Sequence, residues 1–400
     1  MLVMFRYKNF GPFKDEAVFD MRAVKSYKEH PYNLITTYED LPLLKVAAIY
    51  GANASGKSNF VDAYYCFLKI VRTSFQDNNK EDSEEVLETY YNSFLLDESA
   101  YEDTEFEATF RDGNYEIRYG FIYDESRIKY EWLYRTNLTT KRSSVILERE
   151  ESDIELGDSV KRSCAKYLPE IDTDVLALSF FSSLKLKTTA FAQTMSCVMR
   201  NLPARLSHDG MAEHMLNSYW LRDFDEIEKP KLLKFLHGID VGIKDIEVEK
   251  NKKRVEVTTY HIGANSELCP MPLELESDGT RRAIALYSVL RIAAKAGTGL
   301  IIDEFHSQLH PLLQKYLIDL FCEESEEGQL IYTTHDTSLL DKKYMRRDQV
   351  WFVEKNENGE SSLYSLADFK VRNDASFEKD YLGGVYGGIP NLKDFSFGEE

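Results

Sequence analysis

The segment from residue 51 to residue 58 reads GANASGKS, and it separates two stretches with different hydrophobic periodicity. Residues 43–50 are short and almost continuously apolar, which is typical of a strand buried on both faces. From residue 58 to about residue 75 apolar residues recur at helical spacing. A strand that continues through a glycine-rich turn into a helix is the structural context of a phosphate-binding loop. The chain is therefore expected to fold around an α/β core that carries such a loop.

The residue types in this loop suit a nucleoside triphosphate with Mg²⁺. Its glycines let backbone N–H groups turn inward around the β-phosphate, and the helix N-terminus adds a partial positive charge. Lys57 would reach the β- and γ-phosphate oxygens, and the Ser58 hydroxyl would ligate Mg²⁺. A glycine-serine turn without a ligand is the alternative. The predicted nucleotide-binding residues are Gly51, Asn53, Ala54, Ser55, Gly56, Lys57, Ser58 and Asn59.

Two later strands end in side chains that fit ATP hydrolysis. Residues 299–304 form an apolar run that ends in Asp303 and Glu304. Asp303 is predicted to hold Mg²⁺ with its water shell, and Glu304 to polarise the attacking water. Residues 330–335 form a second run that ends in His335, placed where it could meet a γ-phosphate. A paired Asp-Glu at the surface and a purely structural histidine are the alternatives.

A helix start between these motifs supplies a third phosphate-binding candidate. The segment from Ser277 to Arg281, called the signature segment below, precedes a helical run that continues past residue 290. The Ser277 hydroxyl and the Gly279 amide could hold phosphate oxygens there, although a simple N-cap would explain them as well. The motifs occur in the order found in heads of ABC-type ATPases, and the NKxD motif with which GTPases read their base is absent. The chain therefore resembles the RecF and SMC branch of those ATPases.

Four segments narrow the resemblance: residues 5–10 (FRYKNF), 51–59, 303–311 (DEFHSQLHP) and 381–390 (YLGGVYGGIP). They resemble the compact AAA-family, ABC-class ATPases of prokaryotic anti-phage systems and the ATPase half of OLD nucleases. The RloA-type and PARIS-type ATPase subunits are relatives that work with a separately encoded nuclease or toxin. The resemblance implies an ATP-binding and hydrolysing switch in abortive infection. It also implies a homodimer or a higher oligomer built from dimers, an effector nuclease or toxin as partner, and a phage product as trigger.

The resemblance also assigns the signature segment to the opposite copy. In such heads two copies sandwich two Mg-ATP, so Ser277 and Gly279 would contact the γ-phosphate in trans while Glu304 and His335 catalyse hydrolysis. This sequence departs from the family pattern in several places. The signature segment reads SDGTR instead of LSGGQ, a Q-loop glutamine cannot be assigned, and neither a Toprim nuclease segment nor a heptad tract for coiled-coil arms is present.

Periodicity along the chain suggests four regions. An ATPase lobe is expected over 1–160, with an N-terminal hairpin, the phosphate loop and an antiparallel meander whose strands fall between residues 105 and 134. A helical insertion is expected over 161–240, with one helical patch at 211–224. A second ATPase lobe over 241–365 and a C-terminal tail over 366–400 complete the mixed α/β head. The glycine-rich stretch at 381–390 suits either a partner-docking tail or a chain that packs along its own domain.

Charge and composition limit the partners. The net charge of −19 opposes nucleic acid and anionic lipid, so any contact with nucleic acid must be local. The basic segment 250–254 could make such a contact, but its short length favours a solvated hairpin turn. A RecF-like DNA-binding ATPase and a slow-turnover scaffold remain the alternative functions. The five cysteines form no CxxC pair, which favours reduced core thiols over disulfides or zinc. No membrane span or signal peptide is recognisable, so a cytoplasmic location is expected.

Overall fold

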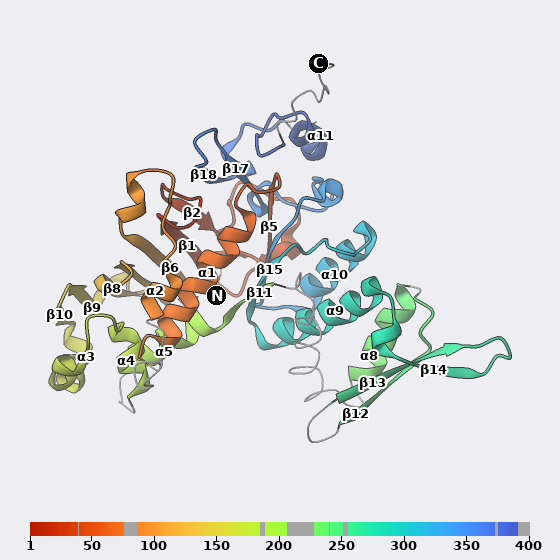
Figure 1. The fold of residues 1–400 in the computed structure, drawn as a ribbon, viewed down its shortest axis with the longest axis horizontal. Helices are drawn as coiled ribbons and strands as arrows, with labels where there is room; N and C mark the ends of the chain where they lie inside the picture. Colours follow the sequence, from red (N-terminus) through yellow and green to blue (C-terminus); the bar gives the residue numbers. More distant parts are fainter. Residues whose placement is uncertain are drawn as a thin grey trace, which may run out of the picture.

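The computed structural model describes residues 1–38, 40–75, 86–184, 189–205, 228–239, 241–250, 255–372 and 375–390 (Figure 1). The helical patch predicted at 211–224 and most of the basic turn at 250–254 lie outside these residues, as do residues 391–400. Among the described residues, none of the helices combines the length and the apolar character needed to cross a bilayer.

A six-stranded sheet carries the phosphate loop. In spatial order its strands are β11 (Asn201–Arg205), β15 (Gly299–Asp303), β16 (Gln329–Thr333), β5 (Val46–Gly51), β17 (Val350–Lys355) and β18 (Ser361–Ser365). All neighbours are parallel except β18, which pairs antiparallel with β17. The expected core strand before the loop is confirmed as β5, which is buried throughout. β11 was not predicted, because it is a short edge strand inside the region expected to be helical.

The second large sheet has seven antiparallel strands. Its spatial order is β10 (Asp153–Leu156), β9 (Arg142–Glu150), β8 (Ile128–Asn137), β7 (Tyr115–Tyr123), β6 (Thr104–Asp112), β1 (Leu2–Lys8) and β2 (Ala17–Asp20). The predicted N-terminal hairpin is confirmed as β1 with β2, and the predicted meander as β6 to β8. The mixed α/β class with a P-loop core and an antiparallel meander is therefore confirmed.

Helix α1 (Lys57–Thr73) lies between the two large sheets (Figure 1). Three of its aromatic side chains, Phe60, Tyr64 and Phe67, are fully buried. The Phe67 ring stacks on Phe121 of β7 with centroids 5.8 Å apart, and the Tyr64 ring meets Phe5 of β1 edge-on at 5.0 Å. This aromatic core fixes the helix that follows the phosphate loop against a rigid sheet.

The opposite face of the parallel sheet is covered by α9 (Asp278–Ala296), α10 (Pro311–Glu324) and α11 (Phe377–Leu382). Helix α8 (Glu228–Gly238) packs on the outer side of α9 and α10. Side chains alternate along β5 to serve both layers: Ala47 and Ile49 join the core around α1, whereas Ala48 and Tyr50 join the core under these helices. Burial on both faces explains why the strand reads as a continuous apolar run.

The 381–390 stretch packs on its own domain, which is the second of the two predicted alternatives. The Tyr381 and Tyr386 side chains are buried, and both rings stack on Phe352 of β17, at 5.2 and 5.8 Å. Gly387 and Gly388 have φ angles of 69° and 67°, which glycine adopts without strain. All five cysteines are free thiols, and only Cys269 departs from the expected core position because it is exposed.

The remaining elements are small. A three-stranded sheet consists of β12 (Asp245–Lys250), β13 (Val255–Ile262) and β14 (Leu268–Pro272), and it projects from the right of the molecule in Figure 1. The short elements are α2 (Val86–Tyr90), α3 (Asp158–Cys164), α4 (Ala177–Ser183), α5 (Thr189–Met199), β3 (Leu34–Ile35) and β4 (Leu43–Leu44).

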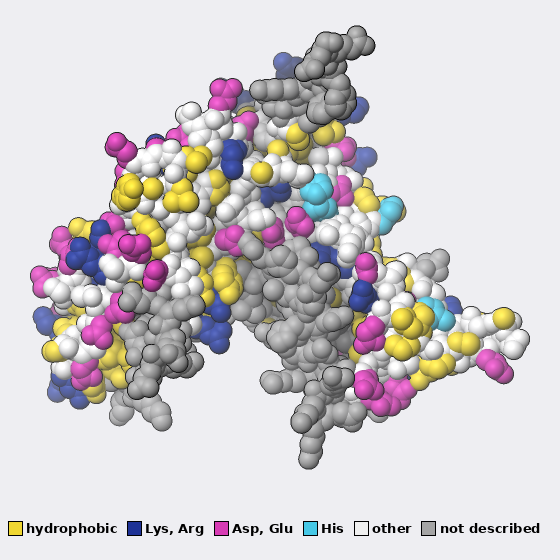
Figure 2. Space-filling model, viewed as in Figure 1, with side chains coloured by type: hydrophobic (Ala, Val, Ile, Leu, Met, Phe, Trp, Pro, Cys, Tyr) yellow, Lys and Arg dark blue, Asp and Glu magenta, His cyan; other side chains and the backbone are white. Residues whose placement is uncertain are grey.

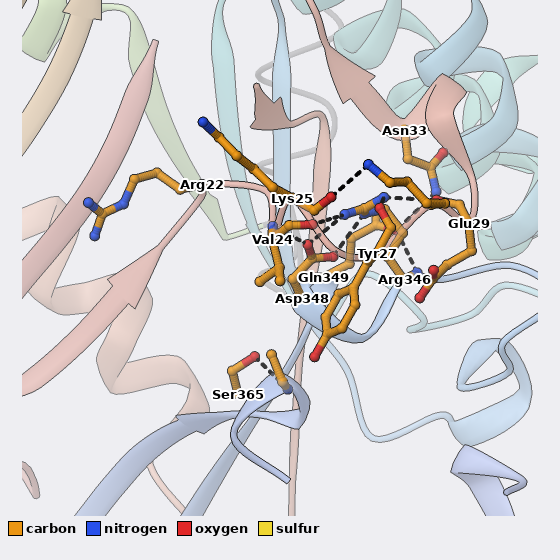
Figure 3. A network of polar contacts seen from close by, with 12 residues as sticks. Arg22, Val24, Lys25, Tyr27, Glu29, Asn33, Arg346, Asp348, Gln349 and Ser365 are labelled. Atoms are coloured by element: carbon orange, nitrogen blue, oxygen red, sulfur yellow. Dashed lines mark hydrogen bonds and ion pairs between the residues drawn. The ribbon is translucent and has the colours of Figure 1, made fainter. Parts of the chain in front are cut away.

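A buried polar network joins the N-terminal part of the chain to the segment before β17 (Figure 3). The Arg346 guanidinium pairs with Asp348 at 2.7 Å and donates to the backbone oxygens of Val24, Tyr27 and Glu29. Arg346 and Asp348 are almost completely buried. Every branch of the guanidinium has an acceptor, so this arginine serves to hold the chain together.

Candidate functional site

The phosphate loop has its shape because two positions cannot carry a side chain. A Cβ on Gly51 would lie 2.5 Å from the carbonyl oxygen of Val353 on β17. Gly56 has a φ of 115° and begins α1, and a Cβ there would lie 3.0 Å from Ser361 Oγ. The loop backbone therefore lies close against β17 and β18 at these two glycines.

Lys57 folds back over this loop. Its Nζ donates to the carbonyl oxygens of Gly51 and Ala52 at 2.9 and 2.8 Å. Burial lowers the pKa of the Lys57 ammonium, and the negative charges of Asp303 and Glu304 act in the opposite direction. The carboxylates of Asp303 and Glu304 at the end of β15 are therefore near enough to act on the charge of the Lys57 ammonium.

The loop fits a phosphate group. The Ser55 hydroxyl is buried without a hydrogen-bond partner, and the partners of the Lys57 ammonium are two neutral carbonyls. Ser58 follows Lys57 in the first turn of α1. A triphosphate with Mg²⁺ would give all three groups a ligand, and their role in binding it stays a prediction.

Asp303 and Glu304 are linked through one threonine. The Thr333 hydroxyl, at the end of the neighbouring strand β16, donates to Asp303 Oδ1 at 2.5 Å and accepts from the Glu304 amide at 2.8 Å. Asp303 is buried, whereas Glu304 is half-buried and has a φ of 50°. Arg282 of α9 also donates to the Glu304 carbonyl oxygen at 2.7 Å. These contacts fix the turn from which the Glu304 carboxylate extends.

Two histidines lie together beside this turn. His335 is exposed just after β16, and its ring centroid is 3.9 Å from that of His306. Burial lowers the pKa of His306 to about 4. Electrostatic repulsion from His335, Arg282 and Lys57 adds to the effect, and the negative charge of Asp336 opposes it. His306 was not among the predicted site residues, although it belongs to the segment that carries the family resemblance.

The signature segment begins α9. The Ser277 hydroxyl accepts from the Thr280 amide at 3.1 Å and lies 2.8 Å from the Thr280 hydroxyl, so it acts as the helix N-cap. A Cβ on Gly279 would lie 3.0 Å from the backbone oxygen of Gln308, in the loop after Glu304. The N-cap alternative is thus observed in the single chain, and the contact with a second copy stays a prediction.

Sequence reasoning missed several residues that hold the site. Thr333, Arg282 and Ser361 contact the site from distant positions in the chain; Ser361 Oγ, for example, donates to the Ser55 carbonyl oxygen at 2.6 Å. Of the predicted loop residues, Asn53 and Ala54 are exposed at the tip, while Asn59 faces Gly11 in the β1–β2 turn. Thr333 lies within the predicted run 330–335, but nothing in the local sequence marks it as a site residue.

Comparison with known proteins gives one family and a set of distant structures. A family profile described as "AAA domain, putative AbiEii toxin, Type IV TA system" matches residues 46–341. No curated protein matches the chain.

The structural matches are distant. The SMC head domain from Thermotoga maritima matches with 14% identity and a TM-score of 0.42, covering 91% of this chain and 98% of that one. An SMC head bound to the C-terminal winged-helix domain of ScpA matches with 15% identity and a TM-score of 0.43, and the match covers 94% of this chain and 99% of that one. The third match is an SMC head with an extended coiled coil, bound to the C-terminal domain of ScpA from Pyrococcus furiosus. Its sequence identity is 15% and its TM-score is 0.35, and the match covers 96% of this chain and 99% of that one.

Proposed function

The chain belongs to the AAA domain family described as putative AbiEii toxin, Type IV TA system, and we propose that it is an ATP-hydrolysing switch subunit of an anti-phage system. The observation that carries the proposal is that the Lys57 ammonium donates to the loop carbonyls of Gly51 and Ala52 while the negative charges of Asp303 and Glu304 act on it. This arrangement supports a site that combines phosphate-binding with water-activating groups.

Each residue has a defined task in this proposal. Lys57 and the loop amides bind the β- and γ-phosphates of ATP, and Glu304 orients the attacking water and accepts its proton. Ser58 and Asp303 would hold Mg²⁺, which when bound would supply positive charge to stabilise the phosphates. His335 contacts the γ-phosphate from the end of β16. The Thr333 hydroxyl, through its hydrogen bonds to the Asp303 carboxylate and the Glu304 amide, holds these two residues in a fixed relative orientation.

The switch requires a second copy. Ser277 and Gly279 stand at the N-terminus of a 19-residue helix, where backbone amides favour an anion. In the proposal they bind the γ-phosphate held by the opposite copy, so ATP closes a homodimer and hydrolysis releases it. If ATP alone shifts the ratio of closed to open protein from 1:99 to 99:1, it must bind the closed form more tightly by about 5.5 kcal/mol.

The output of the switch is control of an effector. The family description names a toxin of a toxin–antitoxin system, and the sequence resembles ATPases that work with a separately encoded nuclease or toxin. We therefore infer that the closed form restrains such an effector until a phage product intervenes. Co-purification with the product of the neighbouring gene, lost in a Lys57→Ala variant, is the expected result; a chain that purifies alone under all nucleotide conditions contradicts this part.

The dimer is tested with a hydrolysis-deficient variant. Glu304→Gln keeps the binding groups but removes the carboxylate that activates water, so this variant should retain ATP and remain a closed dimer in light scattering. Glu323→Gln, an exposed substitution at the end of α10, is the matched control and should behave like the wild type. If Glu304→Gln with Mg-ATP has the same mass as the nucleotide-free protein, the switch is wrong.

A further inference from the structure

The short segment before α9 contains a buried carboxylate that the ATPase mechanism leaves without a role. Glu276 directly follows a 3-10 turn at Leu273–Leu275 and precedes Ser277, the N-cap of α9. Its side chain is only 6% exposed. A buried carboxylate next to a predicted phosphate-binding serine needs partners, and those partners come from another part of the fold.

Both partners of Glu276 lie on one strand of the projecting three-stranded sheet. The Thr259 hydroxyl donates to Glu276 Oε1 at 2.6 Å, and His261 Nε2 lies 2.7 Å from the same oxygen. Thr259 is fully buried, while the His261 side chain is 27% exposed. One carboxylate oxygen therefore connects the start of α9 to β13.

The alternation of β13 explains why these two residues face α9. Residues 257, 259 and 261 share one face of the strand, because side chains alternate with a period of two. Val257 on this face joins the core formed with Phe235 and Leu236 of α8. The opposite face carries Ile262, which is 51% exposed, and Figure 2 shows hydrophobic side chains gathered on this projecting part.

The signature segment is thus held from two sides. Glu276 fixes it to β13 on one side, and Arg282, in the second turn of α9, donates to the carbonyl oxygen of Glu304 on the other. Ser277 lies between these anchors and is attached to the first by a single peptide link. Any displacement of the three-stranded sheet would therefore move Ser277 relative to Glu304.

We propose that Glu276 is a positioning residue, which holds Ser277 and Gly279 in the orientation required to contact ATP in the opposite copy. Through Thr259 and His261 it couples the β12–β14 sheet to ATP hydrolysis. The proposal rests on the proposed function, since it assumes that the signature segment acts in trans. It predicts that Glu276 matters in the copy that donates the signature segment and not in the copy that hydrolyses ATP.

The experiment mixes two inactive variants. The donor copy carries Glu304→Gln, so it cannot hydrolyse ATP but offers an intact signature segment. The acceptor copy carries Ser277→Arg, so its signature segment is blocked while its own Glu304 is intact. The two variants are combined without nucleotide before Mg-ATP is added, so that Glu304→Gln is not first locked as a homodimer. Each variant alone should release little phosphate, and the mixture should regain activity from one composite site. If the mixture stays inactive, the trans arrangement of the proposed function fails.

Glu276→Ala is then added to one copy at a time. In the donor copy it should lower phosphate release by the mixture about tenfold to 100-fold, the effect expected when a contacting group is misplaced by about 1 Å. In the acceptor copy, whose signature segment is already blocked, it should change the rate less than about twofold. Equal losses in both arrangements, or no loss in either, would overturn the inference while leaving the proposed function intact.

A conservative variant separates positioning from folding. Glu276→Gln keeps an oxygen that can accept from both Thr259 and His261, so in the donor copy it should restore most of the activity that Glu276→Ala removes. Affinity of each single variant for ATP, measured by calorimetry, should stay within about twofold of the parent variant. A Glu276→Gln donor as inactive as the Glu276→Ala donor would also contradict the inference.

Discussion

At the level of single residues, the Thr333 hydroxyl determines how the two acidic residues at the end of β15 are oriented. Thr333→Val keeps the shape but removes the contacts to Asp303 Oδ1 and to the Glu304 amide. The Asp303 carboxylate oxygen and the Glu304 amide then each lose a hydrogen-bond partner, and leaving a buried polar group unsatisfied costs about 1–3 kcal/mol. We expect kcat for phosphate release to fall about tenfold to 100-fold.

An isosteric change elsewhere provides the control. Thr136 on β8 is partly exposed, and its hydroxyl lies 2.9 Å from Ser143 Oγ on β9. Thr136→Val should therefore leave the rate unchanged. A Thr333→Val enzyme that retains more than half of the wild-type kcat would show that the hydroxyl does not position Glu304.

His306 predicts a pH dependence of stability. Its pKa of about 4 in the folded chain lies below the ordinary value of 6.5, chiefly through burial. Between these two values the unfolded chain binds more protons, so the free energy of unfolding decreases as the pH falls through this window. Because solvent screens the partly accessible His306 ring, its protonation should lower the free energy of unfolding by only about 1–2 kcal/mol over this window.

The measurement compares His306→Gln with the wild type by urea unfolding at pH 7 and at pH 4.5. The substitution removes the titrating ring, so the variant should lose less stability on acidification than the wild type does. A constant offset between the two proteins reflects the lost ring contact with His335 and is not part of the prediction. Equal losses of stability over this range would contradict the assignment.

Adjacency in the chain decided which site residues could be predicted. The loop residues and the Asp303–Glu304 pair are consecutive in the sequence, so their motifs identify them. Thr333, Arg282 and Ser361 are ordinary in their local sequence, and their contacts depend on how strands pair and helices pack. The same is true of Glu276, whose partners lie on a different element.

At the level of elements, α1 is the component on which both large sheets depend. Phe67 is fully buried and its ring meets Phe5, Phe106, Tyr119 and Phe121 of the antiparallel sheet. Phe67→Ala should lower the free energy of unfolding by about 3–5 kcal/mol, because it leaves a cavity that rigid strands cannot fill.

Tyr65 on the exposed side of the same helix is the matched control. It is 39% exposed and has a cation–π contact with Lys69. Tyr65→Ala should cost about 1 kcal/mol or less in urea unfolding. Similar losses for the two substitutions would mean that α1 is not the tightly packed centre of the fold.

The elements that the sequence predicts are those with an uninterrupted pattern. β5 is a continuous apolar run, and β6 to β8 alternate between clear turns. β11 was not predicted because it is an edge strand of five residues with a proline, and it shows no clear hydrophobic pattern. Its extended conformation depends on pairing with β15. The Arg346 network joins residues about 320 positions apart in the sequence, and a local sequence pattern cannot predict such a contact.

At the level of the whole molecule, net charge determines how the switch responds to salt. Each chain carries a formal charge of −19, so two copies repel each other at long range. Raising the salt concentration screens this repulsion, because the Debye length falls from about 10 Å at 0.1 M to about 3 Å at 1 M. The ATP-bound Glu304→Gln dimer should therefore form at lower protein concentration in high salt than in low salt.

Sedimentation or light scattering across a salt series checks this, and the nucleotide-free protein provides the baseline. The same series separates the switch from a DNA-binding ATPase. Contacts with phosphate backbones release counterions and weaken steeply as salt rises, so a protein that worked on duplex DNA would bind it tightly in low salt and lose it in high salt. Dimers that dissociate as salt increases would show that ion pairs across the interface, and not the ATP contacts, hold the two copies together.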